Sequence, residues 1–355
     1  MTGTNEHIAS YGDHTKTKMF LLPAIGFIVF FLNIALGSVY ISMGDLYDIL
    51  TGAAGTDPTL TNIVVNVRLP QAVTALLAGA ALGAGGLMMQ TLFRNPLAGP
   101  SVLGVSSGAS LGVAVMILFA GVSVGNVSRF SGLAGNMPVV LSAIAGAILV
   151  LVLIGMLAAR FKSNTVVLVM GIMIAYAVSA VVGVLQFYSM KEDLQTYVMW
   201  GLGSFANVSL GQLPWFSSVI VAGLGVTFLL TKPLNALLLG ENYARNLGVN
   251  IRTVRMLVIF VTGLLTAVVT AYCGPIAFLG LAVPHISRNF FRSADHLINI
   301  PGVIFIGGVL ALVCNLLARL PGYEGALPVN SITSIIGAPV VIWIIIRRTE
   351  FSTES

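Results

Sequence analysis

Long apolar runs alternate with short polar intervals along almost the whole chain. Most runs are near the roughly 20 residues that a helix needs to cross a bilayer. They are continuous and do not alternate with a period of two, which favours membrane helices over barrel strands. The pattern predicts an all-α integral membrane protein with about ten transmembrane helices, near residues 19–36, 69–93, 102–121, 138–159, 166–188, 213–230, 256–273, 275–286, 301–318 and 332–346.

The eighth run, residues 275–286, is too short to cross a bilayer as a straight helix. Its 12 residues would rise about 18 Å at 1.5 Å per residue, whereas the hydrocarbon core is about 30 Å thick. The segment must therefore be tilted, extended through His285 and Arg288, or partly re-entrant.

Composition excludes a soluble protein. Apolar residues make up 57% of the 355 residues and charged residues only 8%, against about 25% charged in a soluble domain. The net charge of +5 does not indicate a nucleic-acid partner, because the basic residues form no single patch and instead occupy the intervals between apolar runs. Membrane lipid is the expected surrounding.

The basic residues predict which ends of the helices face the cytoplasm, because cytoplasmic loops are enriched in Lys and Arg. With the N-terminus inside and ten alternating helices, 13 basic residues fall inside and four outside, the latter being Arg68, Arg129, Lys191 and Arg319. Both termini are then cytoplasmic. We expect a tail at 1–18, one membrane domain at 19–348 and a second tail at 349–355. Residues 19–36 form an uncleaved first helix, since a signal peptide has a shorter apolar core.

Glycine is abundant, with 39 residues, and recurs at helical spacing. Gly79 and Gly83 form one GxxxG pair, and Gly104, Gly108 and Gly112 extend a second. Small residues let membrane helices approach closely, which predicts a tight bundle; such faces also allow helices to slide. Cys273 and Cys314 lie within apolar runs and form no metal motif, so packing is their expected role.

The chain lacks the motifs of an enzyme. It has no GxxxxGK[ST] loop, no HExxH and no GxSxG, so we expect no catalytic residue, no metal site and no cofactor bound by this chain. All 12 acidic residues fall in tails, loops or segment ends. An ion-coupled carrier usually holds such a group inside the membrane, so the energy for transport must come from elsewhere or the protein is passive.

One polar stretch, LLLGENYARNLGVNIRTVR at residues 237–255, breaks this pattern. On a helix, Gly240, Ala244 and Gly248 form a strip of small residues, and Glu241 and Arg245 form an i,i+4 ion pair. The predicted topology places the stretch in the cytoplasm. It could lie on the membrane surface, but a smooth strip flanked by charge suits the groove of a partner protein better.

Several longer motifs resemble a known family. RLPQAVTALLAGAALGAGGLMMQTLFRNPLAGPSVLGVSSGAS resembles the signature of FecCD-type permeases, the membrane subunits of type II ABC importers for iron-siderophores, haem and cobalamin. LGENYARNLGV resembles their coupling loop, and GPIAFLGLAVPHISRNFFRSADH and ALPVNSITSIIGAPVVIWIIIRR resemble their two C-terminal motifs. The likeness extends from about residue 20 to 348 in the order of the family.

The resemblance implies an assembly in a bacterial plasma (inner) membrane. A second permease subunit, most simply another copy of this chain, would complete a central pathway. Two ATPase subunits that hold ATP and Mg would dock on the cytoplasmic side, and a soluble substrate-binding protein on the outer side. In this comparison residues 237–249 fit a groove of each ATPase, with the coupling residues Leu237, Gly240, Glu241, Ala244, Arg245 and Gly248.

The same resemblance implies gate and docking residues. Asn95 and Leu97 match the loop that closes the cytoplasmic gate, and Ser163 and Asn164 match a second gate loop more loosely. Arg68 and Arg319 match the outer arginines that pair with acidic residues of the binding protein. The alternative for these two is that each side chain snorkels to the headgroups.

The chain also departs from the family pattern. Gln71 stands where many relatives have a second Arg, and Asn315 where an Asp is usual. The usual ELPVG is ALPVN, which places Ala326 and Asn330 at its ends. These changes put the docking chemistry in doubt. His285 and His296 fall at motif positions and are expected to pack loops, not to bind haem.

The sequence therefore predicts the permease subunit of an ABC importer for a metal chelate, with ferric siderophore or haem ahead of cobalamin. Two alternatives stay open at this point: an ion- or proton-coupled secondary transporter, and a passive channel or scaffold. The apolar, small-residue character of the segments suits bulky ligands and selects none of them.

Overall fold

The computed structural model describes residues 3–37, 39, 41–52, 57–120, 136–161, 163–319 and 326–353. All regular elements in these ranges are helices. In chain order they are α1 (Gly3–Ala35), α2 (Met43–Thr51), α3 (Pro58–Asn62), η1 (Ile63–Arg68), α4 (Leu69–Phe93), η2 (Pro100–Leu103), α5 (Val105–Ala114), η3 (Val115–Phe119), α7 (Met137–Arg160), α8 (Asn164–Tyr188), α9 (Lys191–Gly201), η5 (Phe205–Asn207), α10 (Leu213–Leu229), α11 (Thr231–Leu238), α12 (Glu241–Asn246), α13 (Ile251–Cys273), α14 (Leu279–Phe291), α15 (His296–Ala318) and α16 (Val329–Thr353).

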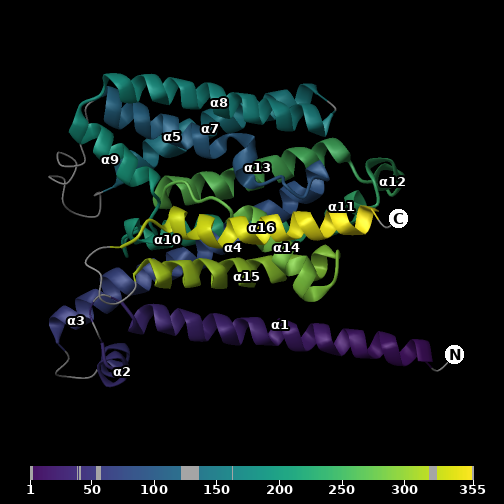
Figure 1. Cartoon of the computed structure of the whole chain (residues 1–355), viewed down its shortest axis with the longest axis horizontal. Coiled ribbons are helices and arrows are strands. Elements are labelled where there is room, and N and C mark those ends of the chain that lie inside the picture. The colour runs from purple at the N-terminus through teal and green to yellow at the C-terminus, as the bar shows by residue number, and fades with distance from the viewer. Residues whose placement is uncertain are drawn as a thin grey trace.

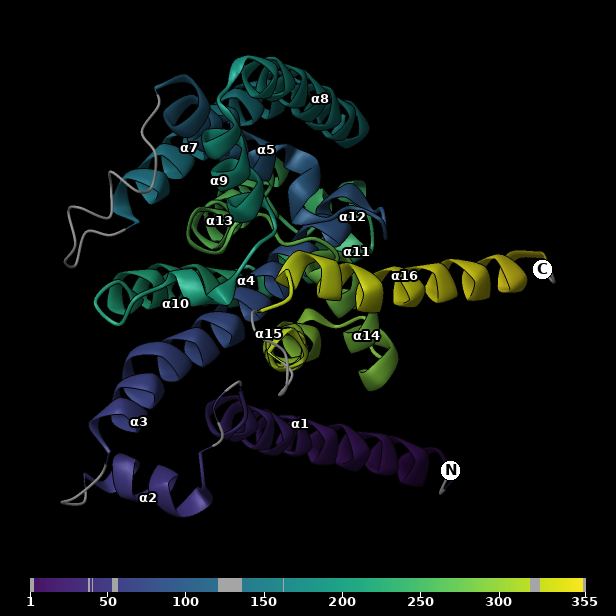
Figure 2. The same cartoon turned by 60° about the vertical axis from the view of Figure 1, so that its left-hand side comes forward.

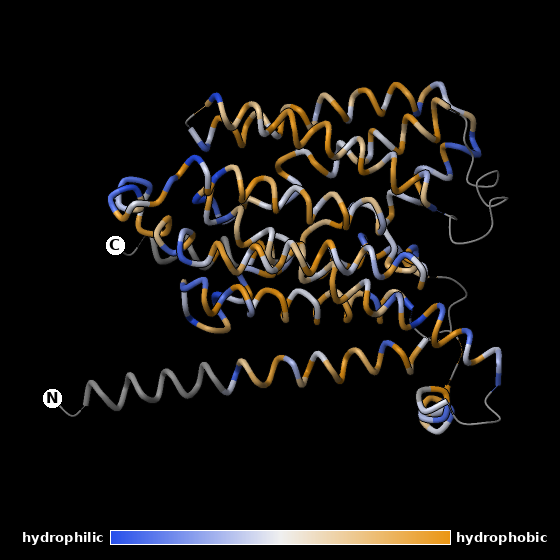
Figure 3. The backbone as a smooth tube through the Cα atoms, turned by 180° about the vertical axis from the view of Figure 1, so that it is seen from behind, coloured by the Kyte–Doolittle hydropathy of each residue, from blue (hydrophilic) through white to orange (hydrophobic). Residues whose placement is uncertain are grey.

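The long helices lie side by side in one bundle (Figures 1 and 2). Helices α2, α3 and α9 gather at one end of the bundle, called here the α9 end. Helix α12 and both chain termini lie at the opposite end, called here the α12 end (Figure 1). Hydrophobic residues fill the middle of the bundle and hydrophilic ones concentrate at its two ends (Figure 3). This distribution is the one that a bilayer around the middle requires.

Within the described ranges, six helices are long and apolar enough to cross a membrane, or seven if α10 and α11, which bend by 51° at their junction, form one span. Each of the ten predicted apolar runs overlaps a helix, and the all-α membrane fold is confirmed. The apolar stretch Val105–Phe119 is shorter than these six helices. That the chain crosses the membrane ten times therefore stays a prediction.

The second predicted helix begins earlier than the sequence suggested. α3, the π-helical turn η1 and α4 form one continuous helix of 36 residues, Pro58–Phe93, about 54 Å long. Asn62, Asn66 and Arg68 interrupt the apolar pattern and concealed this extension. Similarly, α1 includes most of the predicted N-terminal tail and α16 most of the C-terminal one.

The short eighth run becomes a half-length helix. α14 spans Leu279–Phe291 and so extends through His285 and Arg288, which is one of the three alternatives that the sequence left open. Its 13 residues rise about 20 Å. The non-helical residues 274–278 precede it and end at Phe278, whose φ is +66°. The segment therefore covers part of the bundle length with irregular backbone, of which Gly274 is buried and residues 275–278 are half-buried.

Helix α4 is the centre of the bundle, with 20 of its 25 residues buried. It packs against α10, α13, α14 and α15. A Cβ added to Gly79 would lie 2.1 Å from the carbonyl oxygen of Gly307 on α15, and one added to Gly112 would lie 1.9 Å from that of Ser142 on α7. Such backbone contact needs glycine, which confirms that the predicted glycine strips pack helices.

We expect Gly79→Ala to destabilise the bundle because the added methyl overlaps the backbone of α15, and overpacking costs about 1–3 kcal/mol or more. The control is Gly225→Ala on α10, where a Cβ meets nothing within 4 Å and alanine is the better helix former. The melting temperature of each purified variant in detergent checks this. Equal melting temperatures for the two variants would contradict the packing argument.

Candidate functional site

The polar stretch singled out in the sequence forms two short helices joined by glycine turns at the α12 end. α11 spans Thr231–Leu238 and α12 spans only Glu241–Asn246. Gly240 (φ +123°) and Gly248 (φ +82°) adopt positive φ angles, which glycine accepts at no steric cost. We call residues 231–249 the coupling segment.

One expectation for this segment is wrong. Gly240, Ala244 and Gly248 do not form a strip on one helix, because α12 ends at Asn246 and Gly248 lies in the following turn. Ala244 is fully buried and Leu237 is 3% exposed, so both face the bundle and cannot contact a partner. The exposed face instead carries Leu239, Tyr243 and Leu247, with exposed fractions of 66%, 51% and 60%.

Glu241 connects the coupling segment to two other helices. Its Oε1 accepts a hydrogen bond of 2.7 Å from Asn164 Nδ2 at the start of α8, and that nitrogen also donates to the Leu92 carbonyl of α4 at 3.0 Å. Arg255 Nη2 of α13 lies 3.7 Å from the same carboxylate oxygen, and its Nη1 donates to the Phe161 carbonyl before α8. The predicted coupling residue Glu241 and the predicted gate residue Asn164 are thus in direct contact.

A second contact ties the coupling segment to the end of α4. Arg94, in the left-handed conformation at the C-cap of α4, donates through Nη2 to the Leu237 carbonyl at 3.1 Å. Arg94 was counted in the sequence analysis only as a cytoplasmic positive charge. Its pairing with Leu237 joins residues 143 positions apart, which no local pattern indicates.

A third connection passes through His296, which is 1% exposed. Asn235 Oδ1 of α11 accepts from the His296 backbone N–H at 2.9 Å and lies 2.7 Å from its Nδ1, so Nδ1 is the protonated nitrogen toward that oxygen. His296 Nε2 lies 2.8 Å from Thr91 Oγ1 of α4, and Asn235 Nδ2 donates to Asp295 Oδ1 at 2.6 Å. This histidine therefore joins α4, α11 and α15.

The loop after α4 holds the other predicted gate residues. Asn95 Oδ1 accepts from the Leu97 backbone N–H at 2.9 Å, a local turn that leaves the Leu97 side chain 46% exposed. His285 Nε2 lies 2.8 Å from the Pro96 carbonyl and so packs this loop against α14. Ser163 caps α8 by accepting from Val166 N–H at 3.4 Å. The closing of a gate by these residues stays a prediction.

At the α9 end, the expectation of an exposed Arg68 is wrong. This side chain is 3% exposed. Its Nη1 donates to the carbonyls of Ile34 and Ala35, each at 2.8 Å, and its Nη2 donates to that of Val39. Because three main-chain oxygens satisfy the guanidinium, it stays charged inside the protein, and a binding protein cannot reach it in this conformation.

Arg319 is half-buried beside a line of amides. Its Nη2 donates to Asn33 O at 3.0 Å and to Asn33 Oδ1 at 3.3 Å. Asn315 Nδ2 donates to the same Asn33 Oδ1 at 2.9 Å, and Gln71 Nε2 donates to Asn315 Oδ1 at 3.0 Å. Burial, and then repulsion from Arg68, lower the pKa of Arg319 to about 10, which leaves it charged at neutral pH.

The two departures at positions 71 and 315 are therefore paired with each other. Where the family resemblance leads one to expect an arginine and an acid, this chain has two neutral amides in hydrogen-bond contact. A matched replacement of this kind keeps α4 and α15 joined without burying charge. No local sequence pattern indicates this contact, because the two residues are 244 positions apart.

Nothing in these contacts is suited to bond chemistry. Among the described residues no three His, Cys, Asp or Glu side chains gather closely enough to hold a metal ion. Cys273 and Cys314 are free, buried thiols, as the packing interpretation predicts. What the arrangement shows is that polar contacts join the coupling segment to α4, α8, α13 and α15.

Comparison with known proteins agrees with this interpretation. The chain is 32% identical over 326 residues to the vitamin B12 import system permease protein BtuC of Shigella boydii, covering 92% of this chain and 94% of that protein. It is 35% identical over 284 residues to BtuC of Salmonella typhi, covering 80% and 83%. A solved metal-chelate type ABC transporter in an inward-facing conformation superposes with a TM-score of 0.80 at 29% identity, covering 94% of this chain and 99% of that one.

Fold, coupling segment and relatives together define a permease subunit of a type II ABC importer, a multi-pass membrane protein. The model of the FecCD transport family matches residues 25–347. The chain belongs to the FecCD transport family. Members of this class are transport subunits that work with an ATPase and a binding protein.

We expect Asn164→Ala to weaken the junction between α8 and α12, because two hydrogen bonds are lost, at a cost of about 1–2 kcal/mol. Asn164→Asp should cost more, since its carboxylate would face Glu241. The controls are Asn66→Ala and Asn66→Asp, at an exposed site whose side chain donates to Asn62 one turn earlier. Thermal unfolding of the four variants measures the order, and an aspartate variant at 164 as stable as the wild type would refute the contact.

Proposed function

We propose that two copies of this chain form the membrane core of an importer that carries a metal chelate: a ferric siderophore, haem or cobalamin. The observation that carries the proposal is the contact between Glu241 and Asn164, because it joins a partner-facing segment to the predicted gate. Relatives that import vitamin B12 and a structural neighbour of the metal-chelate type support this class of cargo.

The exposed face of the coupling segment supports an ATPase partner at the α12 end. Leu239, Tyr243 and Leu247 are large and exposed beside the charged Arg245. Apolar residues rimmed by charge mark protein contacts. The ATPases bind ATP and Mg, and their closure would push α11 and α12 toward the ends of α4 and α8.

Two contacts would pass that displacement on. Glu241 would pull on Asn164, the first residue of α8, and on Arg255 in the second turn of α13. Asn235 would pull on His296 and thereby on α4 and α15. The loop bearing Asn95 and Leu97 follows α4 directly, so it moves with these ends. In this mechanism the gate loops around Leu97 and Ser163 change state when the ATPases close.

The second subunit is expected to be another copy of this chain. Only 17% of the apolar stretch of α8 is buried. On α16, Ile335 and Ile342 are 72% and 57% exposed. These faces would meet lipid or the second copy, and a pathway between two subunits needs such apolar walls. A loaded binding protein would dock at the α9 end, which in this topology faces outward.

We expect ATP-dependent uptake of a chelate by proteoliposomes that contain this chain, its ATPase and its binding protein. Cyanocobalamin, a ferric hydroxamate siderophore and haemin are the cargoes to compare. Uptake should need ATP and survive an uncoupler. Uptake that continues without the ATPase and stops with an uncoupler would instead indicate a secondary transporter.

The double variant Tyr243→Asp/Leu247→Asp should abolish ATP-dependent uptake and retention of the ATPase during purification, because two carboxylates replace the apolar contact face. Both side chains are exposed, so the fold is retained. Tyr47→Asp on α2, a tyrosine that is 68% exposed at the opposite end, is the control for ATPase retention. Full ATPase retention by the double variant would show that the coupling segment is not the docking surface.

A further inference from the structure

The loop at residues 94–98, which follows α4, takes its shape from its own hydrogen bonds. The Asn95 N–H donates to the Gln90 carbonyl at 3.2 Å, and the Ala98 N–H donates to the Asn95 carbonyl at 3.1 Å. Asn95 Oδ1 accepts from the Leu97 N–H as well, which makes the turn compact. Because the turn is fixed within itself, its place in the molecule depends on contacts with neighbouring elements.

One neighbour of this loop is the coupling segment. Arg94 Nη2 donates to the Leu237 carbonyl at 3.1 Å. The fit is close, because a Cβ added to Gly240 would lie 3.1 Å from the same nitrogen. The first residue of the loop would therefore follow the coupling segment when that segment is displaced.

The other neighbour is α14. His285 Nε2 lies 2.8 Å from the Pro96 carbonyl oxygen. A carbonyl only accepts, so Nε2 carries the hydrogen and donates it. Proline has no N–H of its own, so this carbonyl is the main-chain group that Pro96 can offer to a neighbour. His285 is half-buried, and its imidazole fastens the middle of the loop to α14.

Helix α14 is a firm support for this bond, because further contacts join it to the bundle. Gln90 Nε2 of α4 donates to the Leu281 carbonyl at 3.2 Å, and Arg288 donates to Gln90 Oε1. Ser287 Oγ donates to Asn299 Oδ1 of α15 at 2.8 Å, and both of these residues are buried. A displacement of the coupling segment relative to α14 would therefore load the bond from the imidazole to the loop.

We propose that His285 is a positioning residue for the cytoplasmic gate. Its bond to Pro96 holds the loop so that the adjacent Leu97, whose apolar side chain is 46% exposed on the single subunit, obstructs the pathway between two copies. The bond gives way when the ATPases displace the coupling segment and forms again when they relax. The proposal rests on the importer function proposed above and names the residue that keeps its gate shut without ATP.

Solute leak in the absence of ATP tests this role. His285→Leu removes the donor and keeps much of the bulk, whereas His285→Gln supplies an amide N–H in its place. Proteoliposomes that contain the full importer are loaded with cyanocobalamin or ferrichrome, and release is followed without nucleotide. Because one hydrogen bond is lost, the leucine variant should release at least one probe about three- to tenfold faster than wild type. The glutamine variant should release it at close to the wild-type rate.

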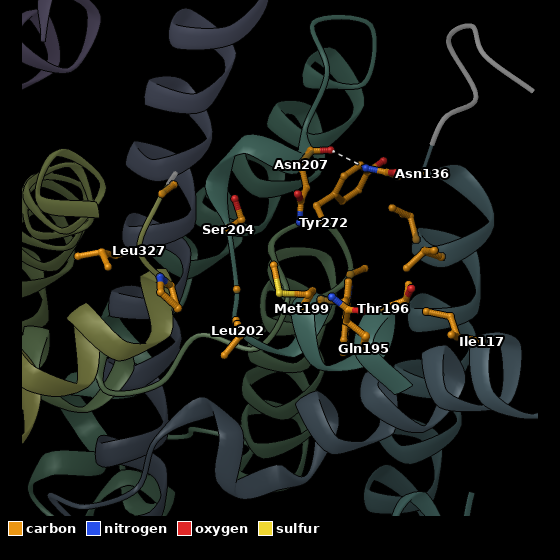
Figure 4. A pocket seen from close by; sticks show the side chains of 17 residues that line it. Ile117, Asn136, Gln195, Thr196, Met199, Leu202, Ser204, Asn207, Tyr272 and Leu327 are labelled. Atoms are coloured by element: carbon orange, nitrogen blue, oxygen red, sulfur yellow. Dashed lines mark hydrogen bonds between the residues drawn. The ribbon is translucent and has the colours of Figure 1, made fainter. Parts of the chain in front are cut away.

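Two controls separate this role from a general loss of stability. Ser287→Ala also removes a hydrogen bond that α14 makes, but it leaves the loop untouched. Gln195→Leu changes an exposed polar side chain on α9, where it lines a cavity at the opposite end of the bundle (Figure 4). Both variants should release the probes at the wild-type rate, and the melting temperature of each variant shows that the compared proteins are folded.

A nitroxide attached at Leu97→Cys follows the loop directly. Wild type gives little background labelling, because its two cysteines are buried. The label should move faster in the His285→Leu background, and His285→Gln should restore the slower motion. This measurement needs neither ATP nor cargo. His285→Ala, which also lacks the donor, takes the place of the leucine variant if that variant does not fold.

The proposal is overturned if neither probe leaks faster from the leucine variant, if Ser287→Ala leaks as fast, or if glutamine at position 285 behaves like leucine. It is also overturned if the label at position 97 moves alike with and without His285. ATP-dependent uptake by wild type separates the two proposals. Uptake with an unchanged leak removes the role of His285 and keeps the importer function, whereas a faster leak without wild-type uptake keeps that role and removes the importer function.

Discussion

The exclusion of charge from the middle of the bundle is the constraint on which the rest of the structure depends. Lipid offers no partner for an ionised group, and over the described spans the acidic side chains stay at helix ends. Helices are therefore held together by contact between backbones, as at Gly79 and Gly307. In a bundle built in this way, the charged side chains that could receive a displacement lie at its two ends.

The polar contacts at the α12 end show how a displacement can enter. Glu241, Asn235 and Arg94 each belong to a different junction, and together they fasten the coupling segment to four long helices. Because each contact is short and partly shielded from water, a displacement of the coupling segment would also displace the ends of these helices. The α9 end is built differently: there Asn33 and its amide neighbours fix α1, α4 and α15 to one another.

Much of this could be predicted from the sequence, and the remainder could not for physical reasons. Apolar runs predicted the helices, and glycine spacing predicted the close contacts, because both are local patterns. The motifs from 68 to 110, around 240 and in the last 80 residues indicated the family. The break between α11 and α12 was missed because Gly240 and Gly248 fit a helical strip as well as a turn. The burial of Arg68 and the pairs formed by Asn164 and Glu241, and by Gln71 and Asn315, arise from tertiary packing of distant residues.

The π-helical turn Ile63–Arg68 fixes the orientation of α3 relative to α4 within one long helix. In this turn the N–H of Leu69 bonds to the carbonyl of Val64, five residues back, so one residue more than usual is accommodated per turn. Removing a single residue there would restore ordinary winding and rotate α3 by about 100° around the axis of α4. Because α1 also precedes this turn and is held to Arg68 and to α15, the length of the turn and the place of α1 in the bundle are fixed together.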